Sequence, residues 1–256
     1  MIRIQDQEKK NYIALFEAYR HSIPVIYSSL HGQYPGEILL EKEGESSLAL
    51  LTTPFCFHFV AGDANFPDAA GRLHSMLFDS YLKATHQPEA IVFCPDETWH
   101  PMLEDVFQRH HGVRDVRKRF KLNRELFQAA VSQMAPPADV QVTLTEEQES
   151  GSAIIYPVCR IIKDGACVSF CSAFMLGKGH AELDVGTEEG YRGHGYAKRA
   201  AATLIAELLK RNIEPDWCTW PYRKESQMLA QTIGFEPLPD VLAYIWTEAD
   251  CGKLEG

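Results

Sequence analysis

The alternation of apolar and polar residues is clearest between residues 182 and 212. Leu183, Val185 and Thr187 alternate with polar or small residues at a period of two, which predicts a strand. A turn of small residues follows over 192–197, and apolar residues then recur at helical spacing. The helical set is Ala197, Ala200, Ala201, Leu204, Ile205 and Leu208. The pattern therefore predicts a strand, a tight turn and a helix that ends near residue 212.

Further strands and helices are expected around this segment. Residues 158–162 and 166–175 predict a hairpin across Lys163-Asp164-Gly165, with a type I′-like turn. Additional strands are expected at 140–144, 216–220 and 241–247, and a helix at 226–233 is closed by Gly234. This order predicts an α/β (α+β) fold, with a mixed, twisted sheet and flanking helices.

The first half of the chain has an α/β pattern without a recognisable chemical motif. Helices are expected over 5–21 (ended by Pro24), 67–84 and 97–111, and strands over 36–42, 46–53, 55–61, 89–94 and 113–122. Six Lys and Arg residues lie between Arg114 and Arg124. We interpret them as charges along a solvated edge strand, which deter sheet pairing, with a phosphate contact as the alternative. Ala135-Pro136-Pro137-Ala138 is the best linker candidate, and it divides the chain into domains 1–136 and 137–256.

Composition narrows the class of protein. The net charge of -10 argues against nucleic acid or a membrane as partner and suits a cationic acceptor. No targeting segment or long apolar run is visible. The seven cysteines lie mostly in apolar strands, which favours reduced thiols in a cytoplasmic protein. No metal is expected, because no Cys-x-x-Cys occurs and the ten histidines show no metal-ligand spacing.

The turn after the strand at 182–187 has the properties of an anion site. Gly193 and Gly195 let the backbone approach a ligand closely, and the first N–H groups of the following helix point toward it. The spacing is neither that of a Walker P-loop nor that of the dinucleotide fingerprint. It matches Arg/Gln-x-x-Gly-x-Gly/Ala, here as Arg192-x-x-Gly195-x-Ala197.

Together with Ser226-Gln-Met-Leu-Ala-Gln-Thr-Ile-Gly-Phe235, this loop resembles the GNAT superfamily of N-acetyltransferases over about residues 155–247. Sparser similarities lie at 57–63, Trp99, 118–120 and the Glu182-x-Asp184-x-x-Thr187 segment. They favour the branch of the zwittermicin A resistance acetyltransferases, and with it a role in antibiotic resistance. The resemblance implies that 137–256 is a GNAT-like catalytic domain that uses acetyl-CoA as co-substrate. The smaller α/β domain 1–136 would then shape the acceptor site.

The resemblance also implies roles for individual residues. The residues expected to bind the cofactor are Val185, Gly186, Thr187, Arg192, Gly193, His194, Gly195, Tyr196, Ala197, Lys198 and Ser226. Glu182 is the first candidate for general base and Asp184 the second. The usual general-acid tyrosine falls at Ala230, so Ser226, Tyr222 or water would protonate the thiolate.

Two further departures from the family are visible. The usual asparagine falls at Arg223, and the paired helices after the first strand of the family have no room here. Three functions therefore stay open. They are direct acetyl transfer to a small cationic amine such as an antibiotic or metabolite, acetylation of a protein amine, and non-catalytic acyl-CoA binding. Exposed strand edges would also allow a homodimer.

Overall fold

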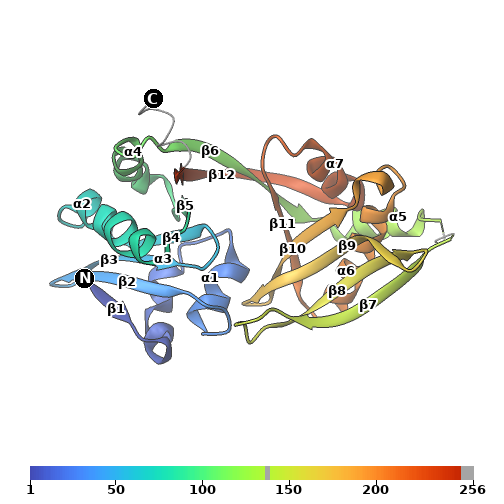
Figure 1. Cartoon of the computed structure of the whole chain (residues 1–256), viewed down its shortest axis with the longest axis horizontal. Helices are drawn as coiled ribbons and strands as arrows, with labels where there is room; N and C mark the ends of the chain where they lie inside the picture. Colours follow the sequence, from blue (N-terminus) through green and yellow to red (C-terminus); the bar gives the residue numbers. More distant parts are fainter. Residues whose placement is uncertain (136–138, 249–256) are drawn as a thin grey trace. The chain divides into compact units, whose positions relative to one another are not determined.

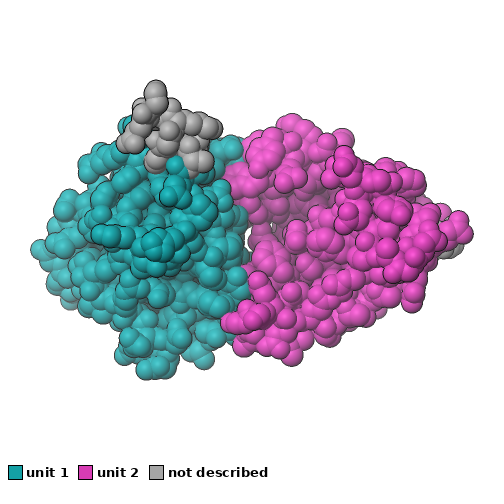
Figure 2. Space-filling view, viewed as in Figure 1, with its two compact units in different colours: residues 1–116, 241–256 teal, residues 117–240 magenta. Residues whose placement is uncertain are grey.

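The computed structural model describes residues 1–135 and 139–248. The chain forms two compact units (Figures 1 and 2). Unit 1 combines Met1–Val116 with the segment from Val241 onward, and unit 2 comprises Arg117–Asp240. The predicted division at 136/137 coincides with neither boundary, and residues 136–138 of the predicted linker lie outside the described residues. No helix within residues 1–135 and 139–248 combines the length and apolar character needed to cross a membrane.

Unit 1 contains strands in the order β1-β2-β3-β4-β5-β12. The strands are β1 (Ile2–Ile4), β2 (Glu37–Glu43), β3 (Ser46–Thr52), β4 (Phe57–Gly62), β5 (Glu89–Phe93) and the second part of β12 (Phe235–Thr247). The helical segments are η1 (Asp6–Phe16), α1 (Ile23–Leu30), α2 (Ala69–His74), η2 (Ser75–Leu82), α3 (Lys83–Thr85), η3 (Glu97–Trp99) and α4 (His100–Gln108). The helices pack on the sheet through fully buried side chains such as Leu73, Leu103 and Val60.

The expected helix over 5–21 is wrong in type and extent. Residues Asp6–Phe16 form a 3-10 helix, and a separate α-helix begins at Ile23. Pro24 belongs to the first turn of α1 and does not end a helix. Proline is tolerated in a first turn because the N–H that it lacks has no partner there.

Unit 2 contains strands in the order β6-β11-β10-β9-β8-β7. The strands are β6 (Val113–Leu122, from Arg117 in this unit), β7 (Gln141–Gln148), β8 (Ile155–Lys163), β9 (Ala166–Gly177), β10 (His180–Thr187) and β11 (Glu214–Thr219). The helices are α5 (Arg124–Ser132), η4 (Glu189–Tyr191), α6 (Tyr196–Lys210) and α7 (Lys224–Ile233). The predicted 163–165 turn is confirmed, since Asp164 and Gly165 both have positive φ, of 51° and 81°.

The interpretation of β6 as an edge strand is wrong. β6 lies between β11 and β12, and its residues from Lys118 to Lys121 pair with β11. Phe120 and Leu122 are buried in the core of unit 2, as is Phe127 of α5, a helix that the sequence pattern did not predict. The boundary of unit 2 therefore lies before β6, because this strand and α5 complete its core.

The two units share one order of elements. In unit 1, β2, β3 and β4 are consecutive antiparallel strands, a helical segment follows, and β5 lies parallel to β4. In unit 2, β8, β9 and β10 are likewise antiparallel, α6 follows, and β11 lies parallel to β10. A further helix and strand end each series. The first series ends with β6, which pairs with β11, and the second series ends with β12, which pairs with β5. The last strand of each series therefore completes the sheet of the other unit.

Candidate functional site

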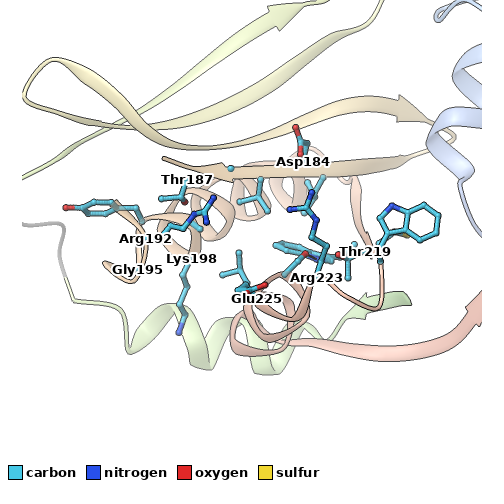
Figure 3. A pocket seen from close by; sticks show the side chains of 18 of the residues that line it. Asp184, Thr187, Arg192, Gly195, Lys198, Thr219, Arg223 and Glu225 are labelled. Carbon is cyan, nitrogen blue, oxygen red and sulfur yellow. Dashed lines mark hydrogen bonds between the residues drawn. The ribbon is translucent and has the colours of Figure 1, made fainter. Parts of the chain in front are cut away.

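The candidate site lies where two parallel strands of unit 2 separate. β10 and β11 pair over only three residue pairs, the last of them Glu182 with Asp216. Both strands continue beyond this point, and a cavity of about 800 Å³ opens between them (Figure 3). This size is typical of small-molecule and cofactor sites. The cavity is lined by Arg117, Leu183, Asp184, Val185, Gly186, Thr187, Tyr191, Arg192, Gly193, Gly195, Tyr196, Ala197, Lys198, Trp217, Cys218, Thr219, Trp220, Arg223, Glu225, Ser226 and Leu229.

One end of the cavity is formed by the turn that leads into α6. Gly193 and Gly195 have φ values of 80° and 77°, a left-handed conformation that favours glycine. Gly195 is the N-cap of α6 and forms no side-chain cap, and the first helical hydrogen bond runs from the Arg199 N–H to the Gly195 carbonyl. The preceding N–H groups of α6 have no acceptor within the helix. They can therefore bind an anion, as the sequence predicted.

The positive charges around the cavity support the same interpretation. Arg192, Lys198 and Arg223 line it, and within the described part of the chain none of them forms an ion pair. The chain as a whole carries a net charge of -10. A local group of cations without ion-pair partners, in an acidic protein, favours a ligand that is itself an anion.

Two hydroxyl groups at the cavity are held in place by neighbouring side chains. The Ser169 hydroxyl lies 2.8 Å from the Thr187 hydroxyl and donates to the Gly186 carbonyl over 2.8 Å. The Trp217 Nε1–H donates to the Ser226 Oγ over 3.2 Å. The Ser226 hydroxyl oxygen thus accepts one hydrogen bond, and its O–H group remains available to donate to another acceptor.

The two candidate bases occupy different environments. Glu182 is buried and does not line the cavity, and its carboxylate lies 3.4 Å from the Arg117 guanidinium. Burial raises the pKa of Glu182, and the charge of Arg117 partly offsets this. Asp184 is exposed, and partial desolvation raises its pKa. In Figure 3, Asp184 points from β10 away from the side on which Arg223 and Thr219 lie.

Most of the residues predicted for cofactor binding lie together around this one cavity. His194 is the exception, because its exposed side chain lies against the carbonyls of Tyr191 and Arg192. Position 230 offers no proton donor, because its residue is an alanine, which is fully buried in the core. Burial raises the pKa of the Cys218 thiol, which makes it a poor nucleophile.

Sequence reasoning missed Arg117 as a site residue. Its guanidinium lies 5.2 Å from the centre of the Trp220 ring, and both residues line the cavity. The sequence signal for it is the run of basic residues at 114–124, for which a phosphate contact is the alternative to edge-strand charges. Among residues 1–135 and 139–248, no group of His, Cys, Asp and Glu side chains is arranged to hold a metal ion.

Comparisons with known proteins agree with this geometry. Residues 159–244 match the family model described as GNAT acetyltransferase. The chain is 21% identical to the uncharacterized N-acetyltransferase YdfB of Bacillus subtilis, over 94% of this chain and 98% of the relative.

Two solved structures show the same fold over nearly the whole chain. A GCN5-related N-acetyltransferase-like protein from Streptococcus suis is 24% identical, with a TM-score of 0.65 over 94% of this chain and 100% of that chain. A tandem GNAT protein from the clavulanic acid biosynthesis pathway is 10% identical, with a TM-score of 0.65 over 95% and 94%. On these matches and the arrangement of its cavity, the chain is similar to GNAT acetyltransferases, with the family model matched over residues 159–244, and the similarity supports an acyltransferase.

Proposed function

We propose that this protein transfers the acetyl group of acetyl-CoA to the amine of a small cationic molecule. The observation that carries the proposal is the cavity between β10 and β11, with free helix N–H groups and the uncompensated cations Arg192 and Lys198 at one end. A pyrophosphate fits that end, because it is a compact anion with several acceptor oxygens.

The rest of the cofactor would follow β10. Beyond Glu182 this strand has no β11 partner, so backbone groups of residues 183–187 on that edge are available to a ligand. These five residues extend over roughly 13 Å to 17 Å, enough for an extended chain with amide groups. Thr187 and Ser226 add hydroxyl groups along the same path.

Glu182 is the proposed general base. An amine is protonated near neutral pH and must lose a proton before it can attack the thioester carbonyl. Glu182 lies at the last β10–β11 pair, and its raised pKa brings it nearer the working pH of a base. Asp184 is the alternative, since it lies two residues further along β10 and lines the cavity.

Calorimetric titration with acetyl-CoA, CoA and ATP tests the proposal. We expect both CoA species to bind and ATP not to bind. Gly195→Asp should weaken acetyl-CoA binding at least about tenfold, because it places a negative charge beside the pyrophosphate. Gly195→Asn is the matched control, since both residues tolerate the left-handed conformation and differ mainly in charge. Equal affinities of the two variants would contradict the assignment of the loop.

A panel of amines then tests the acceptor. It should contain amine-bearing antibiotics, polyamines and a lysine peptide. The sparse similarity to the zwittermicin A resistance branch is the reason for including antibiotics. Acetylation of the peptide alone would favour a protein acceptor. Binding of acetyl-CoA without turnover of any amine would favour a non-catalytic acyl-CoA-binding module.

A further inference from the structure

Arg223 lies at the end of the cavity away from the anion-binding turn. Figure 3 shows it with Thr219 on one side of the view, whereas Arg192 and Gly195 lie on the other. Arg223 lines the cavity and is exposed, and its guanidinium carbon lies 5.8 Å from the centre of the Tyr222 ring. A guanidinium stays protonated at any physiological pH. Arg223 has no ion-pair partner among residues 1–135 and 139–248, so its positive charge is available to a ligand.

Two further groups favour negative charge at the same place. Arg223 is also the N-cap of α7 and forms no side-chain cap there, so the positive end of the helix dipole faces this region. Ser226, in the first turn of α7, lines the cavity and accepts from Trp217, which leaves its O–H free to donate. Glu225 of the same turn also lines the cavity, but no ion pair joins it to Arg223.

The reaction develops negative charge on sulfur as the thiolate leaves. This argument rests on the proposed acetyl transfer. The amine nitrogen bonds to the carbonyl carbon, its proton passes to Glu182, and the C–S bond breaks with its electron pair leaving on sulfur. Position 230 holds a buried alanine and cannot protonate that sulfur.

We propose that Arg223 and the start of α7 stabilise the CoA thiolate as it leaves, so that CoA departs as an anion and takes its proton from water. Arg223 is then a catalytic residue that supplies charge and transfers no proton.

This role predicts a property of the CoA complex that does not depend on turnover. A nearby arginine and a helix N-terminus lower the pKa of a thiol. The thiol of bound CoA should therefore have a lower pKa than the thiol of free CoA. CoA should bind more tightly as the pH rises from 7 toward 8.5. Acetyl-CoA has no ionisable thiol and should not show this dependence.

The test compares Arg223→Gln with Arg223→Lys and with Lys224→Gln. Lys224 is the matched control, because it is the adjacent exposed cation and does not line the cavity. The ultraviolet absorbance of the thiolate reports the ionisation of bound CoA during a pH titration. Arg223→Gln should raise the pKa of the bound thiol by about one unit, which corresponds to a tenfold change in the ionisation constant. It should also lower kcat about tenfold with little change in KM for acetyl-CoA.

Arg223→Lys should retain most of the effect, and Lys224→Gln should behave as the natural protein. An unchanged pKa of the bound thiol in Arg223→Gln would overturn the proposal, even with a lowered kcat. If the natural protein bound neither CoA nor acetyl-CoA, the proposed function itself would fail, and this inference with it.

Discussion

The guanidinium of Arg117 lies 3.4 Å from the carboxylate of Glu182, at the point where β10 and β11 separate. Both side chains are largely withdrawn from solvent, with 15% and 8% of their surface exposed. Arg117 belongs to β6, and its guanidinium also lies over the Trp220 ring. The pair therefore keeps a charged carboxylate beside the cavity, where burial alone would favour its neutral form.

Arg117→Gln should destabilise the protein by about 3 kcal/mol at pH 8, because it leaves the Glu182 carboxylate buried without a countercharge. The variant should raise the folded-state pKa of Glu182 further above its unfolded value. The folded state would then bind a proton more tightly than the unfolded state, so the loss of stability should shrink as the pH falls from 8 to 5. Urea unfolding at the two pH values measures this.

The control for that prediction is Lys118→Gln, which removes the partly exposed ion pair with Asp240 at 2.6 Å. It should cost less than about 1 kcal/mol at either pH. The double variant Arg117→Gln with Glu182→Gln should recover part of the stability that Arg117→Gln alone loses. A loss that is the same at pH 5 and pH 8 would contradict the role assigned to the pair.

Glu182→Gln should lower kcat/KM for acetyl transfer by about 100-fold and leave acetyl-CoA affinity nearly unchanged. In the natural protein, the rate should fall as the pH drops through the raised pKa of Glu182, because protonation removes the base. That acidic limb should disappear in Glu182→Gln. Asp184→Asn is the matched variant, and a larger effect there would transfer the role of base to Asp184.

A fragment that starts at the predicted linker should not fold. Residues 137–248 lack Phe120, Leu122 and Phe127, which belong to the core of unit 2, and they lack the β6 partner of β11. Far-ultraviolet circular dichroism with thermal unfolding should show a cooperative transition for residues 113–248 and none for 137–248. Cooperative unfolding of the shorter fragment would mean that β6 and α5 are dispensable.

We expect one acetyl-CoA per chain, although unit 1 repeats the order of elements of unit 2. In unit 1, β4 and β5 pair as far as Phe59 with Phe93. There the Tyr19 hydroxyl bonds the carbonyls of Val60 and Phe93, at 2.7 Å and 2.9 Å, and so ties the two strands together. The segment leading into α2 carries Asp63 and Asp68, whose charges repel phosphate.

Calorimetric stoichiometry checks this expectation. The natural protein should bind a single equivalent, and Gly195→Asp should weaken the binding of that equivalent. Two equivalents, or an equivalent that keeps the natural affinity in the variant, would show that unit 1 also binds the cofactor.

The strand, turn and helix over residues 182–212 were readable from the sequence because their signals are local. Alternation over 183–187, two glycines and a helical apolar stripe each act within a few neighbouring residues. The structure confirms this segment as β10, the turn with positive φ at Gly193 and Gly195, and α6. The same locality explains the confirmed hairpin turn at Asp164-Gly165.

Only the tertiary structure placed Arg117 beside Glu182, a residue 65 positions away in the chain. The order of basic and apolar residues at 114–124 would be the same whether this strand lay at the edge or in the interior of a sheet. Periodicity alone could therefore not distinguish the two positions. The strand order decided it, because β6 pairs with β11 and thereby brings Arg117 to the cavity. The sequence by itself thus determined β10, the glycine turn and α6. Long-range strand pairing, which no local pattern encodes, decided which charges share the site and where the two units divide.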